Sequence, residues 1–94
     1  MSAQNNLGRQ FDENEQVYKV PAVFFDDHVN RHNDPHEMLS RIVKSTKTHH
    51  HVRLTDDQAS DLESDASYYA DSSPEYVDRK VINSAKATVK AMNQ

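Results

Sequence analysis

The stretch that decides the fold is TDDQASDLESDASYYADSSPEYVDRKVINSAKATVKAM, residues 55–92. In its first half, apolar residues recur at spacings of three and four, which places them on one side of an α-helix. These residues are Ala59, Leu62, Ala66 and Tyr69. Thr55 and Gln58 form a capping-box pattern, and the two aspartates between them suit the positive end of the helix dipole. The sequence therefore predicts an amphipathic helix that begins after Thr55 and ends near residues 70–71.

A second amphipathic helix is predicted over residues 74–92. Ser73 is expected to cap it, with Pro74 at the first helical position, where proline is favoured. The predicted buried stripe consists of Val77, Val81, Ile82, Ala85, Thr88 or Val89, and Met92. A connection of three or four residues makes the two helices antiparallel neighbours, so this half of the chain should form a helical hairpin.

The segment before this hairpin reads as extended structure interrupted by short turns. Residues 16–25, QVYKVPAVFF, are rich in β-branched and aromatic residues and predict a half-buried strand. Pro21 removes one ladder donor, so that strand should lie at a sheet edge or break there. Asp26 or Asp27 is expected to cap a short helical turn through Arg31. A second turn is expected over residues 35–39.

Residues 41–54 have the chemistry of β structure but no clear turn signal. They form either one long bent strand or a hairpin that reverses near Lys47 and Thr48, and the weak alternation leaves the register open. The predicted fold is therefore α+β, with a small N-terminal β element packed on the C-terminal helical hairpin. Residues 16–94 should form a single small domain. Residues 1–15 are polar and aperiodic, and we expect a disordered arm there.

Composition excludes several classes of protein. The 94 residues contain no cysteine, so disulfides and thiolate metal sites are impossible. The one glycine, Gly8, lies in the predicted arm, so a Gly-rich phosphate loop is absent from the predicted domain. No apolar run is long enough to span a membrane, and the polar N-terminus does not resemble a signal peptide. We expect a cytoplasmic protein that has no cofactor, does not contact a membrane and is not an enzyme.

The net charge of −4 conceals an abrupt reversal of sign. Residues 40–54 carry four cations and no acid, whereas residues 55–75 carry seven acids and no base. Segregated charge attracts charged partners. The candidate acidic face consists of Asp57, Asp61, Glu63, Asp65 and Tyr68. The alternative basic face, suited to a phosphate backbone, consists of Arg41, Lys44, Lys47 and Arg53. The third possibility is internal complementarity, with the basic segment against the acidic helix.

Six histidines raise the question of a metal site. His28, His32 and His36 are spaced by four, and two histidines at i and i+4 on a helix can converge on zinc. The run at residues 49–51 could supply a further ligand. Pro35, however, should interrupt the helix, and consecutive histidines on a strand point to opposite faces. The expectation is therefore no metal site, with His28 and His32 as the two residues best placed to contribute to one.

Four fragments of the chain together resemble a group of small proteins of unknown function from actinobacterial viruses and related bacterial genomes. They are VPAVFFDDHVNR (residues 20–31), IVKSTKTHHHVRL (42–54), LESDASYYAD (62–71) and SAKATVKAM (84–92). The resemblance implies a viral or prophage accessory protein that acts inside a bacterial cell, and it implies no activity. We therefore expect a non-enzymatic accessory protein that binds and modulates a bacterial host protein. The alternative is nucleic-acid binding through residues 41–53, and a homo-oligomer is left open.

Overall fold

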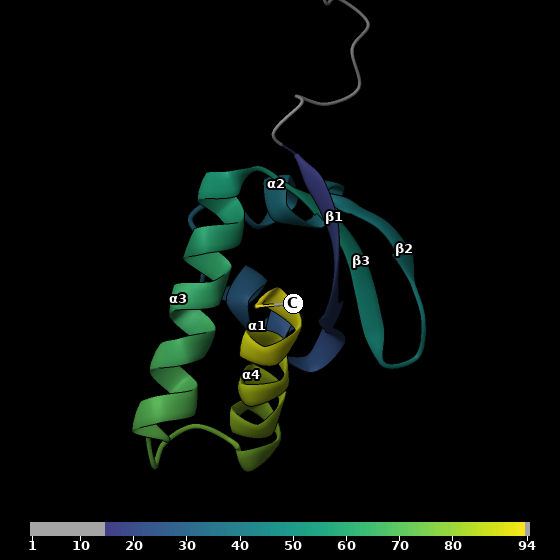
Figure 1. Ribbon diagram of the computed structural model, residues 1–94. Coiled ribbons are helices and arrows are strands. Elements are labelled where there is room, and N and C mark those ends of the chain that lie inside the picture. Colours follow the sequence, from purple (N-terminus) through teal and green to yellow (C-terminus); the bar gives the residue numbers. More distant parts are fainter. Residues whose placement is uncertain (1–14, 94) are drawn as a thin grey trace, which may run out of the picture.

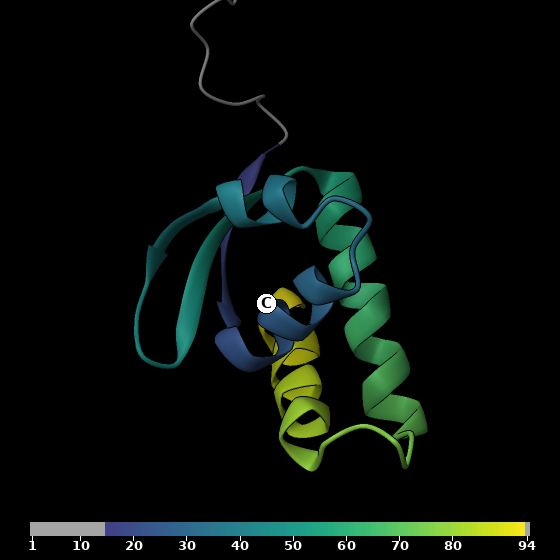
Figure 2. The ribbon, with the colours of Figure 1, turned by 180° about the vertical axis from the view of Figure 1, so that it is seen from behind.

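The computed structural model describes residues 15–93 and has an α+β fold (Figure 1). Its strands are β1 (Gln16–Pro21), β2 (Ile42–Ser45) and β3 (His49–Leu54), which form an antiparallel sheet in the order β1-β3-β2. Its helices are α1 (Ala22–Asn30), α2 (Pro35–Ser40), α3 (Asp56–Ser72) and α4 (Arg79–Met92). Helices α1, α3 and α4 lie on one side of the sheet, and α2 lies at one end (Figures 1 and 2). Residues 1–14 of the predicted arm lie outside the described residues.

The strand predicted over residues 16–25 is half correct, because it ends at Pro21 and helix α1 begins at once. Pro21 has no N–H to donate, and its φ of −58° suits the residue that precedes a helix. As expected, β1 is an edge strand. The first turn of α1 is completed from far along the chain, since the Phe24 N–H donates to Ser84 Oγ of α4 at 2.9 Å. This tertiary contact is invisible to local sequence patterns.

The prediction that Asp26 or Asp27 caps a helical turn is wrong. Both residues lie inside α1, whose N-cap is Pro21, because Phe24 and Phe25 join the helix and are buried in the core. The second predicted turn is confirmed as α2, one residue longer than expected. Its N-cap is Asp34, and Asp34 Oδ1 accepts a hydrogen bond from the Glu37 N–H at 3.1 Å.

Residues 41–54 form the hairpin rather than the single bent strand. Strands β2 and β3 pair with Ile42 opposite Val52 and Ser45 opposite His50, and the register shifts between Ile42 and Lys44. The Thr46 side chain replaces the missing turn residues: its Oγ1 accepts the His49 N–H at 3.1 Å. Threonine hydroxyls can take over this turn-forming role.

The predicted start of α3 is confirmed in detail. Thr55 Oγ1 accepts the Gln58 N–H at 3.2 Å, and Gln58 Oε1 accepts the Thr55 N–H at 3.0 Å, which completes the capping box. The predicted stripe is buried, with Leu62 and Ala66 fully inaccessible to solvent. α3 runs antiparallel to α4 (Figure 1), so the helical hairpin is also confirmed.

The predicted start of α4 is wrong. Ser73 belongs to the end of α3, where its N–H donates to the Tyr69 carbonyl at 2.9 Å and its φ of 43° is left-handed. A residue in that conformation closes a helix and cannot begin the next one. α4 begins five residues later than predicted, at Arg79, after Asp78 Oδ1 accepts the Lys80 N–H at 2.8 Å.

One hydrophobic core joins the sheet to the helices. Its largest fully buried side chains are Phe24, Phe25, Met38, Leu54, Leu62, Val20, Val52 and Thr88. In the stripe predicted for the second helix, Ile82, Ala85 and Thr88 are buried, and Val81, Val89 and Met92 pack partly buried against the core. Val77 also packs against the core, but it precedes α4. Among the described helices, none combines the length and the apolar character needed to cross a bilayer.

Candidate functional site

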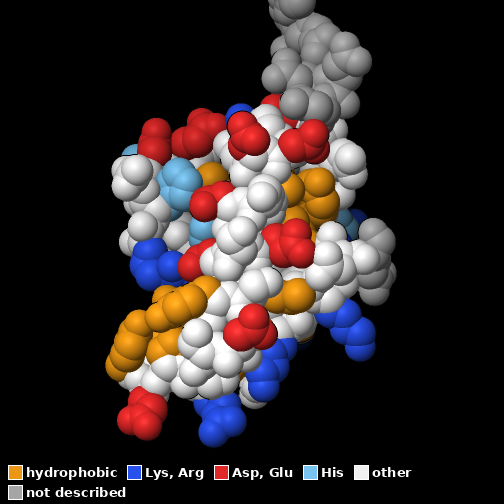
Figure 3. All heavy atoms as spheres, turned by 60° about the vertical axis from the view of Figure 1, so that its left-hand side comes forward, with side chains coloured by type: hydrophobic (Ala, Val, Ile, Leu, Met, Phe, Trp, Pro, Cys, Tyr) orange, Lys and Arg blue, Asp and Glu red, His pale blue; other side chains and the backbone are white. Residues whose placement is uncertain are grey.

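The outer side of α3 carries three of the five predicted acidic-face residues. Successive residues on a helix are about 100° apart, so Asp57, Asp61 and Tyr68 lie within about 40° of one another. All three are exposed, and 55 % of the Tyr68 surface is accessible. We call these three residues the α3 outer stripe. Figure 3 shows this side of the molecule, with carboxylates spread over it and exposed hydrophobic side chains gathered toward its lower end.

The other two residues of the predicted acidic face leave this stripe. Glu63 lies about 160° around the helix from Asp61 and belongs to the opposite flank. Asp65 turns toward α1, and only 20 % of its side chain is exposed. Asp65 is therefore engaged inside the protein and cannot serve a partner without breaking intramolecular contacts.

Asp65 is the centre of an ionic network that joins α3 to α1. The Arg31 guanidinium makes two bonds to this carboxylate, Nη1 to Oδ1 at 3.1 Å and Nη2 to Oδ2 at 2.8 Å. His28 Nδ1 lies 2.7 Å from Asp65 Oδ2. Arg31 also binds Asp27, from Nε at 2.9 Å, and lies 4.8 Å from the centre of the Tyr69 ring.

These contacts fix the charge states of the network. Burial opposes the charged form of Asp65, but the hydrogen bonds from Arg31 and His28 outweigh it, and the pKa of Asp65 falls below its usual value. Burial likewise opposes the charge on Arg31, yet Asp65 and Asp27 raise its pKa above the usual value. Asp65 is thus a carboxylate at neutral pH and accepts a hydrogen bond from His28 Nδ1.

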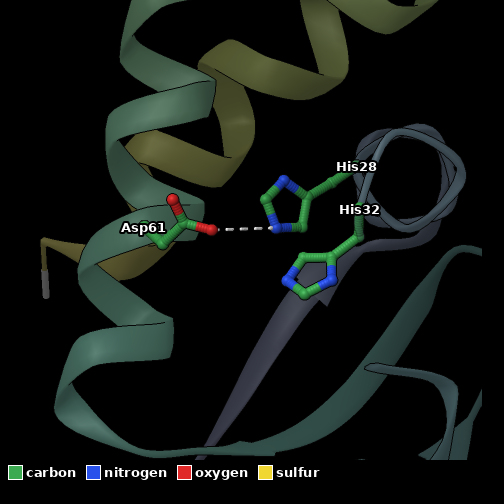
Figure 4. A group of neighbouring side chains, drawn as sticks. All are labelled: His28, His32 and Asp61. Atoms are coloured by element: carbon green, nitrogen blue, oxygen red, sulfur yellow. Dashed lines mark ion pairs between the residues drawn. The ribbon is translucent and has the colours of Figure 1, made fainter. Parts of the chain in front are cut away.

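The second nitrogen of His28 faces a shallow hollow between α1 and α3. The residue is 5 % exposed, and its Nε2 is buried without a hydrogen-bond partner among the described residues. Nε2 lies 3.7 Å from Asp61 Oδ2, and the ring of His32 stands at 63° to that of His28 (Figure 4). One ligand atom from each of His28, His32 and Asp61 lies within 4.8 Å of the others. The hollow has a volume of about 460 Å³.

The predicted basic face does not gather into one site. Arg41 is engaged, with Nη1 2.7 Å from Glu15 Oε2 and Nε 3.0 Å from Glu37 Oε2. These bonds raise the pKa of Arg41, and the hydrogen bond that Arg41 donates to Glu15 contributes most. Internal complementarity therefore exists at Arg41, where the acids are Glu15 and Glu37 rather than residues of α3. Lys44 and Lys47 are exposed on the hairpin.

Strand pairing creates a row of basic side chains on the sheet that was not predicted from the sequence. Lys19 is paired with His51, and His51 with Lys44, so the three side chains share one face across β1, β3 and β2. Arg53 lies two residues along β3 and therefore on the same face. Figures 1 and 2 show α1, α3 and α4 on the other side of the sheet. Lys19 was missed because only pairing of the strands brings it to this row.

The remaining histidines are separate from the hollow. His50 Nε2 lies 2.9 Å from Asp26 Oδ1, and its Nδ1 lies 2.7 Å from Ser45 Oγ. His36 lies on α2 and is exposed. The predicted interruption before Pro35 therefore separates His36 from the other two. His28 lies on α1, and His32 lies just past its end, where the His32 N–H donates to the Val29 carbonyl at 3.0 Å. The two rings stay 5.8 Å apart between centroids.

The sequence did not predict Arg31 as a member of the ionic network around Asp65. A local signal existed, because Asp27 and Arg31 are spaced as an i,i+4 ion pair on a helix. The contact between Arg31 and Asp65 spans 34 residues and has no local signal.

Comparisons of the chain with protein-family models, with curated proteins and with solved structures gave no match.

Proposed function

We propose that this protein is a non-enzymatic binding protein whose α3 outer stripe docks on a basic surface of another protein. The partner we propose is a bacterial host protein, and the setting is the cytoplasm of the host cell. The observation that carries the proposal is the α3 outer stripe itself. It places two exposed carboxylates and an exposed aromatic side chain along one line of a helix whose opposite side is buried in the core.

The stripe has the chemistry of an interface. Asp57 makes no side-chain hydrogen bond or ion pair among the described residues, so its charge is available to a partner. Tyr68 contacts the Tyr69 ring at 5.8 Å between centroids but exposes more than half of its surface. Tyrosine is enriched among the residues that dominate binding energies at interfaces.

Charge segregation in the helical hairpin supports directed association. α3 contains six acids and no Lys or Arg, whereas α4 contains four cations and no acid. Such a polarised surface orients a charged partner during encounter and speeds association at low salt. The acidic and basic sides then favour one docking orientation over its reverse.

The test uses two charge variants of the full chain. The variant with Asp57→Lys and Tyr68→Ala alters the stripe but leaves Asp61 and the ionic network intact. The matched control, Lys44→Glu with Lys47→Glu, changes the same number of residues in the β2–β3 hairpin. In affinity capture from nuclease-treated bacterial lysate, the stripe variant should lose the proteins that both the wild type and the control retain. Equal capture by the stripe variant would contradict the proposal.

The basic row on the sheet favours a second candidate, nucleic-acid binding. Lys19, Lys44 and Arg53 are on the face opposite α1, α3 and α4 (Figure 1), so acidic α3 does not oppose an approaching phosphate backbone there. Binding that rests on phosphate neutralisation falls linearly with the logarithm of the salt concentration. Fluorescence anisotropy with labelled single- and double-stranded DNA and with RNA tests it: this candidate requires a steep salt slope that Lys19→Glu with Lys44→Glu abolishes.

A further inference from the structure

We infer that His28, His32 and Asp61 form a binding site for one divalent transition-metal ion of the zinc type. The site lies in the hollow between α1 and α3 (Figure 4) and is separate from the proposed partner surface, with which it shares only Asp61.

His28 is held as a metal ligand is held. Its Nδ1 donates to the carboxylate of Asp65 at 2.7 Å, which leaves the lone pair of the neutral ring on Nε2. Metal-binding histidines usually donate their other N–H to a carboxylate, which fixes the ring and raises its basicity. Arg31 in turn holds Asp65 by two bonds. The network therefore fixes the ring of His28 from behind.

The buried Nε2 needs a partner that the described residues do not supply. A buried polar atom without a hydrogen bond is costly, and such atoms in proteins call for an explanation. Asp61 Oδ2, at 3.7 Å, is too far for a hydrogen bond. An ion between the two atoms would satisfy both at once.

The spacing of the ligands suits a small ion after a modest contraction. Zinc bonds of about 2.0–2.1 Å place the ligands of a tetrahedron about 3.3 Å apart. The present separations are 3.7 Å between His28 Nε2 and Asp61 Oδ2 and at most 4.8 Å within the group. Asp61 has 64 % of its side chain exposed and can rotate inward, so the contraction does not require a change in the core.

His32 must give up one contact to join the site. Its Nδ1 accepts the Asp34 N–H at 3.1 Å, which places the proton of the neutral ring on Nε2. To bind the ion through Nε2, the neutral ring must carry its proton on Nδ1 instead, and this tautomer breaks the exposed hydrogen bond from the Asp34 N–H. The Asp34 N–H can then bind water, so the exchange is a small loss against a metal–nitrogen bond.

The donor set selects the class of ion. Two imidazoles and one carboxylate suit zinc and its neighbours in the first transition row, whereas Mg²⁺ and Ca²⁺ prefer oxygen ligands. Three protein ligands leave a position for water, as in zinc sites that are open to solvent. The carboxylates of Asp61 and Asp65 outnumber the single cation Arg31 among the residues that line the hollow, so the local charge favours a cation.

The test is calorimetric titration of Zn²⁺ into the full-length protein after treatment with a chelator. We expect one ion per chain and no competition from Mg²⁺ or Ca²⁺. His32→Ala and Asp61→Asn should each weaken binding by about tenfold or more, and Asp65→Asn, which removes the support of His28, should weaken it by about 10–100-fold. Circular dichroism checks that each variant is folded, and all three substitutions spare the fully buried side chains of the core.

The matched control replaces three histidines outside the hollow, with His36→Ala, His49→Ala and His51→Ala, and keeps His50, which is bonded to Asp26 and Ser45. This control should keep the wild-type affinity, and visible absorption of bound Co²⁺ should be the same in both proteins. The inference is overturned if wild-type protein binds no zinc, if His32→Ala and Asp61→Asn bind as the wild type does, or if the control loses binding. The two proposals are tested separately. Asp61→Asn should lose zinc binding, and the variant with Asp57→Lys and Tyr68→Ala should lose partner capture while it keeps zinc binding.

Discussion

Replacing Asp65 with alanine should destabilise the fold by about 2–3 kcal/mol. The substitution leaves the His28 Nδ1–H without an acceptor in a side chain that is only 6 % exposed, and an unpaired buried donor costs about 1–3 kcal/mol. Arg31 loses its bidentate partner but keeps Asp27 and is 38 % exposed, so its loss is that of a surface ion pair, about 0.2–1 kcal/mol. The sum is a large fraction of the stability of a domain of this size.

Urea denaturation followed by circular dichroism measures this loss, with a chelator present so that bound metal does not contribute. For a domain of this size, each kcal/mol lowers the melting temperature by about 4–8 °C. Asp61→Ala is the matched control, because Asp61 lies one turn earlier on α3 and is largely exposed. The control should change stability by less than about 0.5 kcal/mol. Equal stabilities of the two variants would refute the assignment of Asp65 as the centre of the network.

The same variant gives a pH-dependent result. The pKa of Asp65 is lower in the folded than in the unfolded protein, because its hydrogen bonds outweigh its burial. Its stabilising contribution is therefore complete above the unfolded pKa of about 3.9 and is lost as the pH falls through the folded value. The stability difference between the wild type and Asp65→Ala should shrink as the pH falls below about 4. A difference that stays constant between pH 7 and strongly acidic conditions would contradict this ionic role.

Three further predictions follow from single side chains in the helical hairpin. Leu62→Ala removes a fully buried side chain and should cost about 2–5 kcal/mol in urea denaturation; a loss below 1 kcal/mol would argue against its place in the core. Thr55→Ala breaks the capping box of α3 and should cost about 1 kcal/mol, and an unchanged midpoint would mean that the cap contributes nothing. Ser73→Gly relieves a left-handed backbone and should raise the melting temperature, whereas a lower one would contradict the φ of 43°.

The C-terminal half of the fold was predictable because its signals are local. The capping box at Thr55 and the spacing around Leu62 both act within a few residues, and both are confirmed. The start of α4 was mispredicted because Ser73 and Pro74 fit an N-terminal capping pattern equally well. Ser73 instead ends α3 in a left-handed conformation, which excludes it as the cap of α4. That conformation depends on how α3 ends and not on the residues that follow Ser73.

The candidate site was only partly predictable for a different reason. The spacing of His28 and His32 was visible in the sequence, but their approach to Asp61 depends on how α1 packs against α3. Asp65 was assigned to an outward acidic face, yet its contact with Arg31 turns it inward. Likewise, the basic row needs the pairing of β1 with β3, which brings Lys19 beside residues far along the chain.

The central claim is that the α3 outer stripe binds a protein partner, and quantitative capture by two variants tests it most directly. Wild type, Asp57→Lys with Tyr68→Ala, and Lys44→Glu with Lys47→Glu are each immobilised and exposed to nuclease-treated bacterial lysate. Captured proteins are then quantified by mass spectrometry, and direct binding to the purified candidate is measured. The account predicts that one partner is retained by the wild type and by the Lys44 and Lys47 variant and is lost from the Asp57 and Tyr68 variant. Loss of the partner from the Lys44 and Lys47 variant, with retention by the Asp57 and Tyr68 variant, would contradict the claim. The binding surface would then lie on the sheet.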